Sequence, residues 1–155
     1  MREAEVQGRQ QVSDAAAAAY QARREALHGA VTDLEHELEA LEAQPVPDAR
    51  RLLAALRGLR TTLLEHVEHA DAPGGLLTQV FETAPWFANR TDQLRNEHGD
   101  LLAATDGLIE RAGAGDAVET LLSDAHVLAD RISDHRHRGT ALLLDAFMLD
   151  IPAGD

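Results

Sequence analysis

The chain of 155 residues contains no cysteine and few aromatic residues, which make up 3% of the sequence. The absence of cysteine excludes disulfides, thiolate-bound zinc, iron–sulfur clusters and thiol catalysis. Any metal must therefore be held by His, Asp or Glu. Because aromatics are scarce while 45% of the residues are hydrophobic, the core must come mainly from Leu, Ala, Val and Ile. This composition favours packed helices over strands.

Positive charge is also scarce, since 27 Asp and Glu oppose 14 basic residues, all of them arginine, and give a formal charge of -13. An acidic chain without a dense basic block repels phosphate backbones and anionic lipids, so we expect neither a nucleic-acid nor a membrane partner. The only early apolar run, at residues 15–19, is too short for a signal or membrane helix. We therefore expect a cytoplasmic protein.

Apolar residues recur at alternating spacings of three and four, which is the pattern of long helices that bury one face. Pro and Gly clusters interrupt the pattern and mark the connections between helices. Short connections make consecutive helices antiparallel neighbours, so the fold class is predicted to be all-α, an up-down-up-down four-helix bundle. The predicted units are a polar extension at 1–12 and a bundle domain at 13–155. Within this domain we expect long helices near 13–43, 48–71, 85–113 and 116–151 and a short helix at 76–82. The expected N-cap residues are Ser13, Asp48 and Asp116.

Histidines occupy inward positions on three of these helices, at His66, His98 and His135, and His28 adjoins the inward residue Leu27 on the first helix. At a rise of about 1.5 Å per residue the four can lie at one level. Four buried imidazoles require a metal, mutual hydrogen bonds or trapped water. A metal or metallic cofactor is one interpretation, and a polar or water-filled layer without metal is the other. The remaining histidines, at positions 36, 69, 126 and 137, are interpreted as surface residues.

The order of these motifs resembles the hemerythrin-like, or HHE cation-binding, family. That family has a lone His on its first helix, His-x-x-x-Glu on the second, Glu-His on the third and His-x-x-x-Glu on the fourth. The resemblance implies a four-helix bundle, commonly with two irons bridged by carboxylates, that serves in oxygen binding, oxygen or iron sensing, or peroxide and nitric oxide chemistry. The matching segments are 26–28, 64–70, 94–98 and 134–139.

The sequence departs from the family pattern at the two bridging carboxylates, because Ala70 and Gly139 stand in their places. Without these negative charges a standard di-iron centre is not expected. Asp71 could supply a carboxylate, Glu65 or Glu97 could turn inward, or one metal could sit on imidazoles alone. The small residues could also open space for a larger ligand such as haem.

The sequence therefore predicts a hemerythrin-like metal-binding protein in oxygen, redox or metal sensing or handling. Iron is the metal that the resemblance implies, with zinc, haem or no metal as alternatives. The competing hypothesis is a metal-free bundle that acts as a structural or protein-interaction module. No catalytic motif is found, which favours a non-enzymatic role. Oxygen is the expected small ligand, and the first helix could support a homo-oligomer or a protein partner. The predicted metal ligands are His28, His66, His98, His135 and Asp71.

Overall fold

The computed structural model describes residues 2–73 and 75–147, with side chains described for 14–15, 17–73 and 75–146. Within this part every regular element is helical. The four long helices are α1 (Arg2–Glu42), α2 (Ala49–Asp71), α4 (Ala88–Gly113) and α5 (Val118–Phe147), and the short ones are α3 (Leu76–Thr83) and the 3-10 turn η1 (Pro85–Phe87). The predicted all-α class is confirmed, whereas the predicted tail near Pro152 lies outside the described residues.

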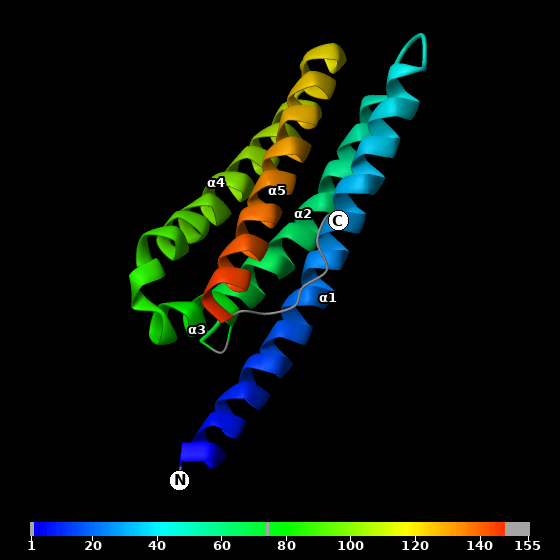
Figure 1. Ribbon diagram of the computed structural model, residues 1–155. Coiled ribbons are helices and arrows are strands. Elements are labelled where there is room, and N and C mark those ends of the chain that lie inside the picture. The colour runs from blue at the N-terminus through cyan, green and yellow to red at the C-terminus, as the bar shows by residue number, and fades with distance from the viewer. Residues whose placement is uncertain (1, 74, 148–155) are drawn as a thin grey trace.

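The long helices pack in a ring, α1 on α2, α2 on α4, α4 on α5 and α5 on α1. Figure 1 shows α1 and α2 as one antiparallel pair and α4 and α5 as the other. The short helix α3 closes one end of the bundle and contacts all four long helices. The predicted four-helix arrangement is therefore confirmed, with α3 as the additional element expected between the second and third long helices.

The helix ends follow local chemistry in most places. Asp48 caps α2, because its carboxylate accepts a hydrogen bond from the backbone N–H of Arg50 at 2.9 Å, as expected of an N-cap aspartate. The start predicted for the first helix at Ser13 is wrong, because α1 begins at Arg2. The last long helix begins at Val118, two residues after the predicted cap Asp116, whose carboxylate accepts a hydrogen bond from Arg111 Nε at 3.1 Å.

Two apolar clusters fill the bundle. The larger one occupies the half nearer the α1–α2 and α4–α5 connections and includes buried Leu38 and Leu121. The smaller one surrounds α3 and includes buried Leu77, Val80 and Leu142. The inward faces agree with the predicted spacing, since the buried residues of α2 are Leu52, Leu56, Leu59, Leu63, His66 and Ala70.

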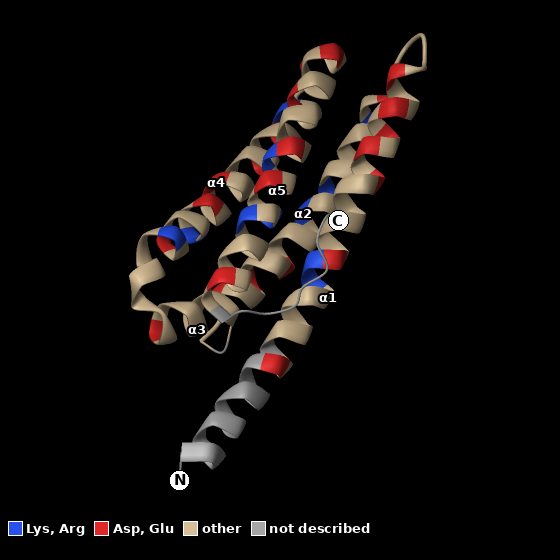
Figure 2. Ribbon diagram, viewed as in Figure 1, with Lys and Arg blue, Asp and Glu red and all other residues tan. Residues whose placement is uncertain are grey.

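The charged surface is mainly acidic. Figure 2 shows Asp and Glu along α1, α4 and α5, whereas on α2 they lie only near its C-terminal end. No helix within residues 2–73 and 75–147 is long and apolar enough to cross a membrane.

Candidate metal centre

A layer of buried polar side chains separates the two apolar clusters, and each long helix contributes to it. Such a layer is costly in a helical core, because buried polar groups need hydrogen-bond or charged partners. Its members occupy inward positions of the helices, between the apolar residues of one cluster and those of the other. They are Arg24 of α1, His66 of α2, His98 of α4, and His135, Arg136 and Thr140 of α5, each at most 6% exposed.

The three histidines of this layer face one another. The ring centroids of His66 and His98 are 5.7 Å apart, those of His66 and His135 are 5.7 Å apart, and those of His98 and His135 are 4.8 Å apart. One ring nitrogen from each lies within 4.8 Å of one nitrogen from each of the others. Imidazole nitrogens suit zinc, copper, iron and nickel. The group can therefore supply three ligands to one such ion.

Two of the histidines are held in place by carboxylates from a neighbouring helix, one at the end of α2 and one on α4. Nδ1 of His98 lies 3.0 Å from Oδ2 of Asp71, and Nδ1 of His135 lies 2.7 Å from Oε2 of Glu97. A carboxylate only accepts at neutral pH, so each imidazole donates from Nδ1. In the neutral form of each ring this fixes the tautomer and leaves Nε2 with a lone pair. The same His–carboxylate pairs orient metal-binding histidines in other proteins.

The carboxylates themselves carry further positive partners. Arg138 pairs with Glu97, and Arg95 Nε lies 3.8 Å from Asp71 Oδ1. Burial tends to raise the pKa of Glu97, but hydrogen bonds from His135 and Arg138 outweigh it and lower the pKa. Glu97 is therefore an anion at neutral pH. The rings of His98 and His135 are thus each held by a carboxylate that is itself paired with an arginine.

His66 has no such partner. It is 3% exposed, and its Nδ1 is buried without a hydrogen bond. Burial and then repulsion from His135 and His98 lower its pKa to about 3. The pKa of His135 is also lowered, first by burial, although Glu97 partly opposes the shift. The neutral form of an imidazole is the one that binds a metal.

The structure brings together three of the four histidines predicted as ligands, and His28 is not among them. His28 is half-buried on α1, one turn beyond the layer, where Arg24 takes the inward position. Asp71, the fifth predicted ligand, lies behind His98 rather than beside the three ring nitrogens. The surface assignment of His126 agrees with the structure, because its Nε2 lies 2.6 Å from Glu42 at an exposed position.

Gly139 is explained by a contact that the sequence analysis did not identify. A Cβ at this position would lie 2.7 Å from the hydroxyl oxygen of Tyr20, closer than side chains pack. The space expected beside Gly139 for a larger cofactor is thus filled by Tyr20. The ring of Tyr20 also lies near His66, with centroids 6.1 Å apart.

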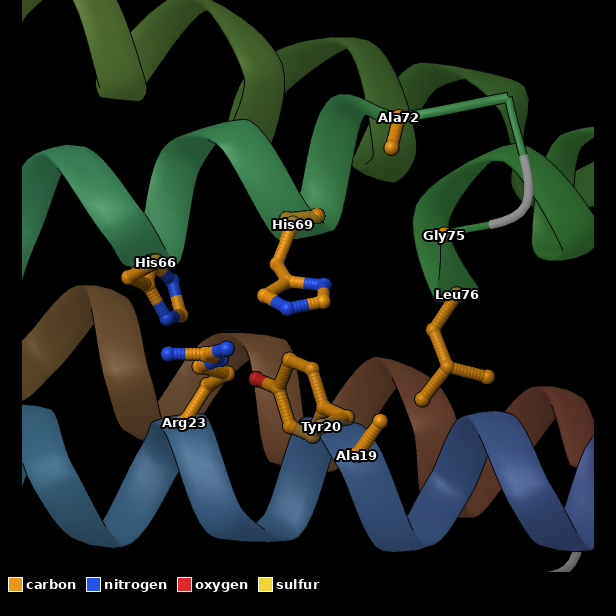
Figure 3. Close-up of a pocket in the computed structure, with 9 residues that line it drawn as sticks. Ala19, Tyr20, Arg23, His66, His69, Ala72, Gly75 and Leu76 are labelled. Atoms are coloured by element: carbon orange, nitrogen blue, oxygen red, sulfur yellow. The ribbon is translucent and has the colours of Figure 1, made fainter.

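The other small residue, Ala70, does border open space. A cavity of about 300 Å³ lies between α1, α2 and the start of α3. In Figure 3, Tyr20 and Arg23 extend from α1 toward His66 and His69 on α2. The cavity is lined by Ala19, Tyr20, Arg23, His66, His69, Ala70, Ala72, Gly75 and Leu76.

Tyr20 and Arg24 form a polar link from the cavity wall to α5. Nε of Arg24 donates to Oγ1 of Thr140 at 2.7 Å, and Tyr20 hydrogen-bonds the same side chain. Burial raises the pKa of Tyr20, and the charges of Arg24 and Arg136 offset part of the rise. Tyr20 therefore stays protonated at neutral pH. Among the described residues Arg24 has no carboxylate partner, so its charge adds positive potential to the layer.

The chain matches no protein-family model, no curated protein and no solved structure.

Proposed function

We propose that this protein binds one transition-metal ion on His66, His98 and His135 and acts as a hemerythrin-like sensor or carrier in oxygen, redox or metal handling. One observation carries the proposal: three buried imidazoles offer nitrogens within 4.8 Å of one another. Two of them are oriented by the carboxylates of Asp71 and Glu97. In a polar core layer without a metal, nothing would require the nitrogens of three histidines to lie this close together.

The donor set fits one ion better than two. A pair of close cations requires bridging carboxylates to offset its charge, and the positions that would hold them are Ala70 and Gly139. The hydroxyl of Tyr20 occupies the space next to Gly139, and Asp71 and Glu97 are engaged as partners of histidines. Iron is proposed from the family resemblance, and zinc is the alternative that three imidazoles also suit.

Three protein ligands leave a coordination position for a small molecule, as in catalytic zinc sites. A bound iron would supply one-electron redox chemistry and an open site for a ligand such as oxygen. The chain's own contribution is to keep the buried rings of His66 and His135 neutral, to fix His98 and His135 through Nδ1, and to exclude bulk water with the apolar clusters on either side. The cavity beside His66 gives a small ligand a route toward the layer.

The direct test is elemental analysis and metal titration of protein purified without a metal-binding tag. We expect one Fe²⁺, Co²⁺ or Zn²⁺ per chain, a visible absorption spectrum with Co²⁺ that reports nitrogen coordination, and a melting temperature that rises with metal concentration. Two metals per chain would contradict the single-ion site. No metal after supplementation with all three ions would overturn the proposal.

The outer carboxylates give a second test of the site. Asp71→Asn and Glu97→Gln remove the charge that orients His98 and His135 but keep the side-chain size. We expect each to weaken metal binding about 10- to 100-fold, as for other outer-shell partners of metal-binding histidines. Competition titration against a chelator measures the change. Asp106→Asn, on the exposed surface, is the matched control, and an equal loss there would mean that only net charge matters.

The competing function is a metal-free bundle that binds another protein. Large aromatic side chains favour it, since Phe81 of α3 is 47% exposed and Trp86 of η1 is 74% exposed. Exposed aromatics are enriched at protein interfaces. This module requires no metal, so failure of the metal titration together with a partner that is lost on Trp86→Ala would support it.

A further inference from the structure

The cavity between α1, α2 and α3 carries chemistry of its own. At about 300 Å³ it equals the volume of about ten water molecules in the liquid, at the lower end of the range for small-ligand sites. Its apolar wall comes from Ala70, Ala72 and Leu76, and Figure 3 shows Arg23, Tyr20 and His69 facing the same space. The cavity is thus apolar on one side and polar on the other.

The polar side consists of hydrogen-bond donors. Arg23 carries a fixed positive charge, the hydroxyl of Tyr20 is protonated, and His69 can donate from its ring. No Asp or Glu is among the described residues that line the cavity. Buried Arg24 follows Arg23 on α1 and has no carboxylate partner among the described residues, so it adds to the positive potential. These donors and positive charges favour an anion locally, in contrast to the chain's overall formal charge of -13.

A second observation, independent of the cavity's donors, is that Nδ1 of His66 lacks a hydrogen-bond partner. His66 is 3% exposed and lines the cavity, and within the described part of the chain its Nδ1 is buried without a hydrogen bond. His98 and His135 each donate from one nitrogen to a carboxylate. When one nitrogen of His66 binds a metal, the other carries a proton and needs an acceptor. Among the described residues none provides an acceptor for Nδ1.

Arg23 is available to a ligand even though it has a neighbour. Its Nη1 lies 3.4 Å from Oε2 of Glu65, and the two side chains are 38% and 53% exposed. Exposed pairs of this kind contribute little to stability, about 0 to 1 kcal/mol. A carboxylate that enters the cavity would form the same kind of charge-assisted hydrogen bond with Arg23 and would add apolar contacts with the cavity wall. Exchange of one partner for the other is therefore favourable.

We propose that this cavity binds a small organic carboxylate with a short apolar chain. Its carboxylate lies between Arg23 and His66, and its chain packs on Ala70, Ala72 and Leu76. The ligand then does for His66 what Asp71 does for His98 and Glu97 does for His135. The inference deepens the proposed metal site, because an anion here also balances the charge of an ion on three neutral imidazoles, but the cavity and its donors do not require the metal.

The test is calorimetric titration of the protein, as purified and after chelator treatment, with acetate, butyrate, hexanoate and benzoate. Butyramide, hexanol and butylamine are the matched neutral and cationic probes. We expect butyrate or hexanoate to bind at least about tenfold more tightly than butyramide or hexanol, which corresponds to the loss of one charge-assisted contact. Butylamine should not bind. Equal binding of the acid and the amide, or no binding of any carboxylate in either preparation, would overturn the proposal.

Variants locate the site. Arg23→Gln should weaken carboxylate binding about tenfold, and Ala70→Leu should abolish it by filling the cavity. Ala19→Leu narrows the cavity from an exposed position on α1 and serves if Ala70→Leu does not fold. Arg60→Gln, which removes one exposed positive charge paired with Asp106, is the control and should bind normally. Unchanged binding in both Arg23→Gln and Ala19→Leu would place the carboxylate elsewhere and contradict the proposal.

Metal titration of the same preparations separates the two hypotheses. Arg23→Gln and Ala19→Leu keep the three histidines, so we expect their metal stoichiometry to equal that of the parent protein. A chain that binds carboxylates but no metal would retain the cavity and lose the metal proposal. If the chain binds metal but no carboxylate, the metal proposal stands and the carboxylate proposal is overturned.

Discussion

His66→Ala/His135→Ala should lose all metal-dependent stabilisation. These residues supply two of the three converging nitrogens, and His98 alone cannot hold an ion against water. A ligand that binds only the folded state adds about 4 kcal/mol to the free energy of unfolding when its free concentration is 1,000 times its Kd. We expect that gain in the parent protein and none in the variant. Urea unfolding with and without metal measures it.

The comparison is made within each protein, with and without metal, so the cost of the cavities left by two imidazoles cancels. His36→Ala/His126→Ala is the matched control, because it also removes two imidazole side chains, but from exposed positions. The control should keep the full metal-dependent gain. A gain that survives in His66→Ala/His135→Ala, or that disappears in the control, would place the metal at another site.

Much of the fold could be predicted because the helix spacing is strict. The inward positions of α2 and α4 lie in the structure as predicted, since alternating spacings of three and four place residues on one helix face. Proline and glycine clusters located the connections for the same local reason. The start of α1 could not be located in this way, because Ser13 is a good N-cap type but also tolerable inside a helix.

His28 lies outside the cluster of three histidines for a reason that can be read from the sequence. The inward spacing of the first helix, read backwards from Leu27, reaches Arg24 and then Tyr20, again at intervals of three and four. Arginine is rarely buried, so sequence reasoning favours His28 over Arg24 as the polar inward residue of this helix. The offset of four residues between Arg24 and His28 shifts the level along the helix by about 6 Å. A strict extension of the spacing identifies Arg24 as an inward residue.

The contacts across helices could not be predicted from spacing. The hydroxyl of Tyr20 occupies the space beside Gly139, and this depends on how α1 and α5 are rotated toward each other. The roles of Asp71 and Glu97 depend on the same rotations, which place their carboxylates behind imidazoles rather than among them. Spacing along one helix gives the face of a residue but not its partner on another.

Acid should unfold the metal-free protein by protonating the histidine layer. The pKa of His66 is about 3 in the folded state, against an ordinary value of 6.5. Below pH 6.5 the unfolded chain therefore binds a proton that the folded chain does not, and stability falls as pH decreases toward 3. The full loss from this one residue is on the order of 4 to 5 kcal/mol. The lowered pKa of His135 adds to it, and that of Glu97 adds a further loss at lower pH.

Replacement of His66 by leucine tests this expectation, because it removes the titrating ring and keeps an apolar side chain of similar size. Between pH 6.5 and 4.5 the variant should lose about 2 to 3 kcal/mol less stability than the parent protein. Urea unfolding at several pH values in the presence of a chelator measures the difference, and His36→Leu, at an exposed position, is the control. Parallel pH profiles for the parent and His66→Leu would mean that His66 takes up its proton without cost. The layer would then already be open to water, and a dry metal site could not be built on it.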